Sequence, residues 1–101
     1  MFDVSIDIVE YLKEYHTDES KAIKGRDLIC LFNLTDRELR LVISSLRQGG
    51  KAICSSTSGY WYSENPSDIQ VTLNRLEGQV KNMNLTIQGL KKVLTGGTHD
   101  A

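Results

Sequence analysis

The sequence predicts an α+β fold that is mostly helical, with three short helices and a β-hairpin followed by one long helix. Thr35 and Glu38 form a helix-capping pattern that opens an amphipathic stretch, and a Gly-Gly pair ends that stretch. The two β-like runs KAICSS and YWYS flank the tight polar connection TSG, as in a hairpin. Beyond Pro66, apolar residues recur at alternating spacings of 4 and 3, which is typical of a coiled coil.

The composition indicates one small globular domain with an appended element. The chain has 101 residues, of which 40% are hydrophobic and 25% charged. It contains no run of about 18 apolar residues and no basic, apolar leader, so we expect neither a membrane span nor a signal peptide. We therefore expect a cytoplasmic protein that does not contact a membrane.

The residues that would support catalysis or metal binding do not form recognisable patterns. Cys30 and Cys54 lack the spacing of a zinc site and each falls in an apolar stretch, so we expect two buried thiols. No carboxylate pair, Cys/His dyad or phosphate-binding loop stands out. The sequence therefore predicts no enzyme, no metal site and no cofactor.

Two helices are predicted before the capped one. The first spans about residues 4–16, and its predicted buried face, with Ile8 beside it, consists of Ile6, Val9, Leu12 and Tyr15. The polar run from His16 to Ser20 predicts a loop. A short second helix is predicted in KGRDLICLFN, with inward residues Leu28, Leu31 and Phe32.

The third helix carries the candidate binding surface. At about 100° per residue, its core face consists of Leu39, Val42, Ile43 and Leu46. The opposite face consists of Arg37, Leu41, Ser44 and Gln48, with Arg40 and Arg47 on one flank. Arginines separated by small polar side chains let a helix enter the major groove of duplex DNA and bind phosphates or guanine. The alternative is that this face is an ordinary solvent-exposed surface.

Charge is distributed unevenly along a chain whose net charge is −1. Residues 1–34 hold seven acidic and four basic side chains, whereas residues 37–63 hold four basic side chains against Glu38 alone. The low net charge argues against a general polyanion binder. The segment 37–63 is therefore the candidate electropositive surface.

The order of helix, helix, capped helix, Gly-Gly and hairpin is that of a winged helix-turn-helix. The segment GRDLICLFNLTDRELRLVISSLRQGGKAICSSTSGYWYS resembles the winged helix-turn-helix domains of the biotin-repressor type. It is more similar still to small winged-helix proteins encoded by phages and prophages of Gram-positive bacteria, and the motifs LR.GG, ICSS and GY carry that similarity over about residues 6–63. The resemblance implies this fold and binding to DNA.

The resemblance also implies which residues meet DNA. The expected contacts on the third helix are Thr35, Arg37, Arg40, Ser44 and Arg47, and those at the hairpin tip are Ser56, Thr57 and Ser58. To these the residue pattern adds Gln48, on the outer face, and Lys51, in the electropositive segment.

Two departures from the family pattern accompany these residues. Leu41 stands where many relatives place Lys or Arg, and Lys24 replaces the usual Ser or Thr cap. In relatives with the GY motif the tyrosine turns toward the helices, so the resemblance, together with alternation along the strand, implies that Tyr60 and Tyr62 point inward and Trp61 outward. Leu41 and Trp61 could therefore contact a protein partner instead. The alternative for Trp61 is half-burial against the C-terminal helix.

The long C-terminal helix is predicted to start at Asn65, where a capping Asn precedes Pro66 and the first-turn Asp68. Its apolar seam consists of Ile69, Leu73, Leu76, Val80, Met83, Ile87, Leu90 and Leu94. The predicted organisation is a winged helix-turn-helix domain at 1–64, an oligomerisation helix at 65–95 and a flexible tail at 96–101.

An apolar seam of this length is unfavourable in water unless another surface buries it. We therefore expect self-association as a dimer or higher oligomer. The alternative is that the helix folds back on the first helix of its own domain. Few charges lie beside the seam, so strand orientation and the choice between dimer and tetramer stay open.

The function these observations favour is that of a duplex DNA-binding protein of a phage-like element, acting in transcriptional or replication control. The alternative is a protein-interaction module, in which the winged helix and coiled coil bind a replication or host protein without reading DNA. The arginines of the third helix favour DNA, and Leu41 and the low net basicity favour a protein.

Overall fold

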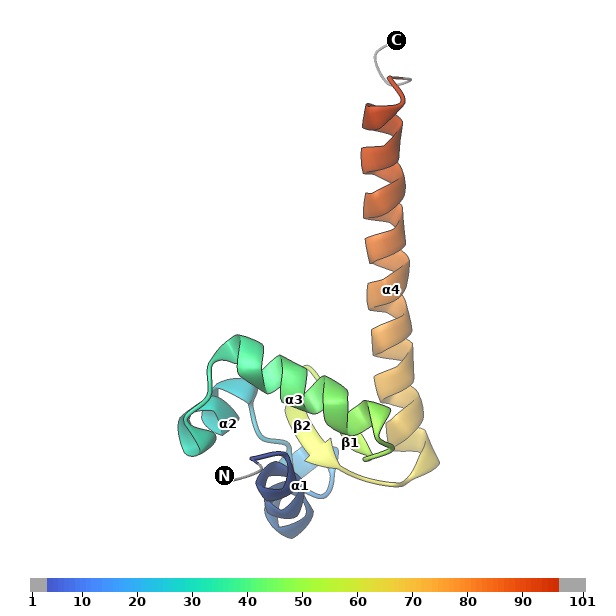
Figure 1. The fold of residues 1–101 in the computed structure, drawn as a ribbon. Coiled ribbons are helices and arrows are strands. Elements are labelled where there is room, and N and C mark those ends of the chain that lie inside the picture. Colours follow the sequence, from blue (N-terminus) through green and yellow to red (C-terminus); the bar gives the residue numbers. More distant parts are fainter. Residues whose placement is uncertain (1–3, 97–101) are drawn as a thin grey trace.

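The structure is a computed structural model, and it describes residues 4–96. These residues form four α-helices, one short 3-10 helix and a two-stranded antiparallel sheet (Figure 1). The elements in chain order are α1 (Val4–Tyr15), the 3-10 helix η1 (Glu19–Lys21), α2 (Gly25–Phe32), α3 (Asp36–Gln48), β1 (Ile53–Ser56), β2 (Gly59–Tyr62) and α4 (Pro66–Leu94). The predicted α+β class, mostly helical with a hairpin and a long C-terminal helix, is confirmed.

The hydrophobic core lies where α1, α2, α3 and one face of the hairpin meet. Its buried members are Ile8, Val9, Leu12, Ile23, Leu28, Leu39, Ile43 and Ile53, and Leu46, Tyr60 and Tyr62 pack against them from partly buried positions. Each fully buried aliphatic side chain contributes about 1.5–3 kcal/mol relative to an exposed one. This core holds α3 in place and leaves its opposite face in solvent.

The buried face of α1 differs from the predicted one. Ile8, Val9 and Leu12 are buried, but Ile6 and Tyr15 are exposed. The prediction was wrong because a spacing of three residues falls short of a full turn. Over the nine residues from Ile6 to Tyr15 the helix makes about two and a half turns, so these two side chains point in opposite directions.

The segment after α1 is more ordered than the predicted loop. Asp18 caps η1 by accepting a hydrogen bond from the Lys21 amide at 3.1 Å. The Ser20 hydroxyl also donates to this carboxylate, and chiefly for that reason the pKa of Asp18 is lowered. Ile23 then pairs with Tyr60 through two backbone hydrogen bonds of 2.8 and 2.9 Å, so a third stretch of chain lies beside β2.

Trp61 is fully buried, contrary to the prediction that it faces solvent. The predicted alternation is correct, since Tyr60 and Tyr62 pack on the core. The other face of the hairpin, where Cys54 pairs with Trp61, is also covered. The sequence left two possibilities open for Trp61, exposure to solvent and half-burial against the C-terminal helix. The first is wrong, and the side chain is buried more completely than the second implied.

The two cysteines lie in different environments. Cys54 is buried as expected, but Cys30 is exposed on α2. The prediction for Cys30 was wrong because α2 buries only the side occupied by Leu28, and Leu31 is exposed as well.

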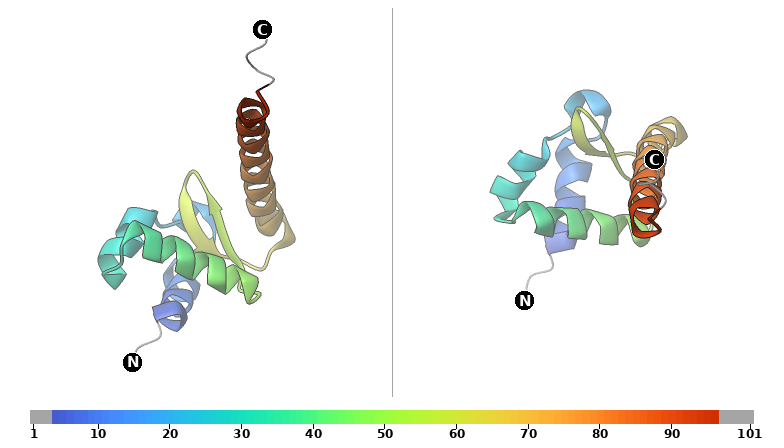
Figure 2. Two further views of the ribbon diagram at one scale, coloured as in Figure 1. Left: turned by 45° about the horizontal axis from the view of Figure 1, so that its top comes forward. Right: turned by 90° about the horizontal axis from the view of Figure 1, so that it is seen from above.

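The long helix α4 leaves the rest of the fold as a projecting arm (Figures 1 and 2). Its first turns pack on β1, where Thr72 is buried and Ile69 and Leu76 are half-buried. Every residue from 77 to 95 is exposed, so the predicted alternative, in which the helix folds back on the first helix of its domain, is wrong. Of the predicted tail, only Gly96 is described, and residues 97–101 lie outside the described range.

Candidate functional site

Helix α3 is held at its start by the predicted capping box. The Glu38 amide donates to the Thr35 hydroxyl at 3.0 Å, and the Thr35 amide donates to the Glu38 carboxylate at 2.8 Å. These two bonds satisfy backbone groups that a helix start otherwise leaves unpaired. The Thr35 side chain, a predicted DNA contact, is thus engaged within the helix.

The outer face of α3 exposes most of the predicted contacts. Arg37 is exposed, and within residues 4–96 no hydrogen bond or ion pair engages its side chain. Arg40 forms an exposed ion pair with Asp36 at 2.7 Å, and Gln48 donates to Ser44 at 3.2 Å. Exposed pairs of this kind stabilise the fold by at most about 1 kcal/mol. The Arg40 and Gln48 side chains can therefore leave these pairs to bind a partner.

Arg47 behaves differently, because its guanidinium turns toward the hairpin. Its Nε donates to the carbonyl of Ile53 at 2.8 Å, and a terminal nitrogen donates to the Ser55 hydroxyl at 2.9 Å. Burial is the main cause of the lowered pKa of this arginine. Arg47 therefore ties the end of α3 to β1, a role that no local pattern in the sequence indicates.

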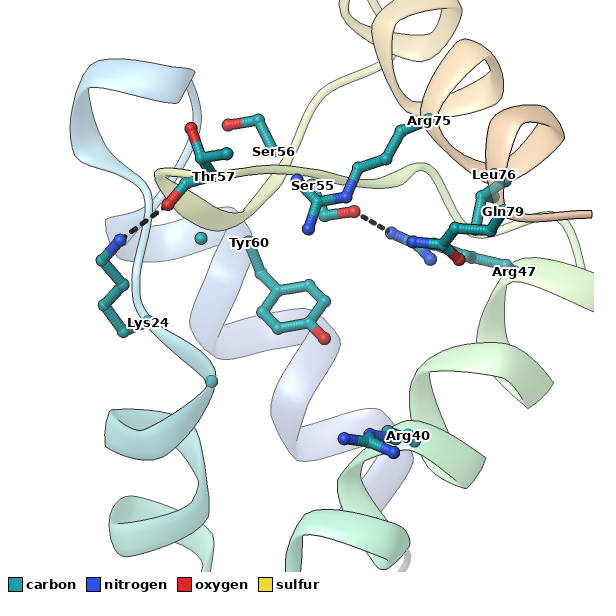
Figure 3. A pocket seen from close by; sticks show the side chains of 12 residues that line it. Lys24, Arg40, Arg47, Ser55, Ser56, Thr57, Tyr60, Arg75, Leu76 and Gln79 are labelled. Atoms are coloured by element: carbon teal, nitrogen blue, oxygen red, sulfur yellow. Dashed lines mark hydrogen bonds between the residues drawn. The ribbon is translucent and has the colours of Figure 1, made fainter. Parts of the chain in front are cut away.

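The hairpin turn is anchored at its tip. The Ser56 hydroxyl donates to the carboxylate of Glu19 at 2.6 Å, and the Ser58 amide donates to Ser56 at 3.0 Å. The Lys24 ammonium donates to the carbonyl of Thr57 at 2.7 Å (Figure 3). Lys24 is the N-cap residue of α2, but its side chain makes no capping hydrogen bond. Its side chain instead bonds to the hairpin turn at Thr57.

A groove of about 560 Å³ opens between α3, the hairpin and the first turns of α4 (Figure 3). We call it the α3–α4 groove, and its lining residues are Lys24, Gly25, Arg40, Arg47, Ser55, Ser56, Thr57, Gly59, Tyr60, Arg75, Leu76 and Gln79. Four of these residues are cationic and none is acidic. A second hollow of about 420 Å³ adjoins it, and Ser44 and Gln48 line that one.

The predicted DNA contacts divide into two groups with respect to this geometry. Those that line one of the two hollows are Arg40, Ser44, Arg47, Gln48, Ser56 and Thr57. Those outside both are Thr35, Arg37, Lys51 and Ser58. Sequence reasoning missed Arg75 and Gln79 because it considered α4 only as an oligomerisation element.

Six of the eight predicted oligomerisation residues form an uncovered stripe along α4. Leu73, Val80, Met83, Ile87, Leu90 and Leu94 are between 44% and 86% exposed. Ile69 and Leu76 are half-buried, because the first turns of α4 pack on the protein's own hairpin. The stripe that stays open to a partner therefore consists of Leu73 and the seam residues from Val80 onward.

Comparisons with known proteins give no further assignment. No family model, curated protein or solved structure matches this chain. Within residues 4–96, no helix is both long and apolar enough to cross a membrane, and no group of three or more His, Cys, Asp or Glu side chains could hold a metal ion. The candidate site thus rests on its own geometry and charge.

Proposed function

We propose that this chain is a winged helix-turn-helix protein that binds duplex DNA as a dimer or higher oligomer. Its role would be transcriptional or replication control in a phage-like element. The observation that carries the proposal is the exposed cationic face of α3 next to a groove lined by Lys24, Arg40, Arg47 and Arg75 without an acidic residue. The link to a phage-like element comes from the sequence resemblance alone.

The connection between α2 and α3 supports a helix-turn-helix. Asn33 ends α2 in the left-handed conformation, with φ 53°, and its amide bonds back to the carbonyl of Ile29. Leu34 and the cap residue Thr35 complete a three-residue turn into α3, and α2 packs against α3. Short turns of this length join the two helices of DNA-binding helix-turn-helix motifs. In this interpretation α3 enters the major groove and the hairpin is the wing.

Self-association provides the affinity that one domain lacks. A single domain with a few cationic contacts binds DNA weakly, and its affinity falls steeply as salt rises. Two domains held together by α4 would bind with a high effective concentration for the second contact. The exposed apolar stripe of α4 supports this arrangement, because a stripe of that size is rarely left in solvent.

The test replaces the two exposed arginines of α3. The double variant Arg37→Ala, Arg40→Ala should weaken binding to a fluorescent duplex and leave the circular dichroism spectrum unchanged. The slope of log K against log salt should fall in magnitude by ~1 for each phosphate that an arginine no longer neutralises. The matched control is Lys91→Ala, Lys92→Ala, which removes the same charge from the far end of α4. Equal DNA binding by the two double variants would overturn the proposal.

A second function is favoured by one specific observation. Leu41 is 59% exposed near the middle of the outer face of α3, where a groove-reading helix more often presents a polar group. An exposed leucine there suits a protein-interaction module that binds a replication or host protein. Trp61 does not support that function, since it is fully buried.

The variant Leu41→Lys separates the two functions. A DNA-binding helix gains a cation at its centre, so its affinity for duplex DNA should rise at low salt. A protein-binding helix loses an apolar anchor and gains a charge that would need desolvation, so capture of its protein partner should fail. Tighter DNA binding supports the first function. No DNA binding by either the wild type or the variant supports the second.

A further inference from the structure

We infer that the α3–α4 groove holds a phosphate of the DNA backbone, and that Arg75 of α4 binds this phosphate together with Lys24 and Arg40. The inference rests on the proposed function and extends it. It gives α4 a second role, since the helix would then contact DNA with its first turns and a partner chain with its later ones.

The first argument is charge. The groove brings together cations from three parts of the chain, with Lys24 just before α2, Arg40 and Arg47 on α3 and Arg75 on α4. Within residues 4–96 no hydrogen bond or ion pair engages the Arg75 side chain. Figure 3 shows the Arg75 side chain extending from α4 toward the hairpin, where Arg47 is bonded to Ser55. Burial is the main cause of the lowered pKa of Arg47, and the positive charge of Arg75 lowers it further, as expected for two like charges that line one groove. A bound anion would relieve this repulsion.

The second argument is the supply of polar groups. The ring of Tyr60 points into the groove, and Ser55, Ser56 and Gln79 line it as well (Figure 3). Hydroxyl and amide donors placed beside arginines are the usual partners of DNA phosphate oxygens. Arg47 is already bonded to the hairpin, so it contributes its charge, whereas Arg40 and Arg75 can turn their donors to a phosphate.

The third argument is the geometry of α4. Arg75 lies about a third of a turn around the helix from the centre of the apolar seam, so one side of the helix can meet DNA while the seam meets a partner helix. The last residue of α4 that lines the groove is Gln79. From Val80 onward every residue of the apolar seam is exposed. DNA bound to α3 would therefore lie in the corner between α3 and the projecting arm of Figure 1.

The test compares two charge-removing variants on the same helix. Arg75→Gln removes the groove cation, and Lys81→Gln removes an exposed cation that does not line the groove. Binding of the full chain to a fluorescent duplex is measured by anisotropy over a range of salt concentrations. Arg75→Gln should weaken binding at low salt and reduce the magnitude of the salt slope by ~0.9, whereas Lys81→Gln should leave the slope unchanged.

The outcomes separate this inference from the proposed function. If Arg75→Gln behaves like Lys81→Gln while the Arg37 and Arg40 double variant loses affinity, the groove inference is overturned and DNA binding by α3 stands. If the wild type binds no duplex at low salt, both are overturned. A third variant, Arg75→Lys, keeps the charge and should restore the wild-type slope. Failure of this lysine to restore any of the slope would show that Arg75 does not act as a phosphate contact.

Discussion

The backbone amide of Ser55 on β1 donates a hydrogen bond to the hydroxyl of Thr72 on α4 at 3.0 Å, and both residues are buried. The same hydroxyl lies 3.2 Å from the carbonyl of Asp68, one turn earlier. The start of α4 is thereby fastened to the free edge of the hairpin. The direction in which the arm leaves the domain depends on this junction.

Replacing Thr72 by Val should destabilise the fold, because the shape is kept but the buried Ser55 amide loses its acceptor. The expected loss is about 1–3 kcal/mol in the free energy of unfolding, measured from urea denaturation curves. Thr86→Val is the matched control, since Thr86 is exposed on the same helix. Its effect should stay within about 0.5 kcal/mol. Identical urea midpoints for the two variants would mean that the junction does not hold α4 in place.

Gly59 is the position where the hairpin tolerates no side chain. Its φ is +127°, and an added Cβ would lie 2.3 Å from the carbonyl oxygen of Ile23. Gly59→Ala should therefore lower the free energy of unfolding by roughly 2–4 kcal/mol and break the pairing of Ile23 with Tyr60. Gly78→Ala should raise it by about 1 kcal/mol, because Gly78 is helical with open space around it. Thermal melts of both variants test the pair, and a stable Gly59→Ala protein would contradict the approach of these two segments.

The two cysteines should differ sharply in reactivity. Burial raises the pKa of the Cys54 thiol, so at neutral pH very little of the reactive thiolate is present, and the side chain is also screened from reagent. Cys30 is exposed. In the folded protein an alkylating reagent should modify Cys30 first and reach Cys54 only on unfolding, as read by mass spectrometry of the intact chain. Equal rates for the two thiols under native conditions would show that the Cys54 face of the hairpin opens.

The sequence predicted those elements whose signals are local. The capping box at Thr35 and the Asn65-Pro66 start of α4 indicated the correct helix boundaries, because a cap is decided by a few neighbouring residues. The hairpin and its alternation were also predicted correctly. These features needed no knowledge of what packs against them.

What the sequence could not predict depends on contacts between distant segments. Trp61 is buried and Arg47 is bound to β1 because elements far apart in the chain meet at the hairpin. The α3–α4 groove is likewise lined by both Lys24 and Arg75, which are far apart in the chain. A periodicity assigns a residue to one face of its own helix or strand, but it does not say what covers that face.

The exposed seam of α4 provides the sharpest test of self-association. Val80→Asp together with Ile87→Asp would place charges in an apolar interface that offers them no partner, at a cost of several kcal/mol per chain. The matched control is Asn82→Asp together with Gln88→Asp, which adds the same charge to the same helix away from the seam. The fold should survive in both variants, since the core around Leu28 and Leu39 does not use the seam.

Sedimentation velocity should therefore show an oligomer for the wild type and the control, and a folded monomer for the seam variant. DNA affinity of the seam variant should also fall, because the second domain is then not held at a high effective concentration. Matching circular dichroism spectra for all three proteins would establish that the fold is intact. A wild type that sediments as a monomer at every concentration would refute self-association through α4, and the exposed stripe from Val80 to Leu94 would then have to be covered by a different protein.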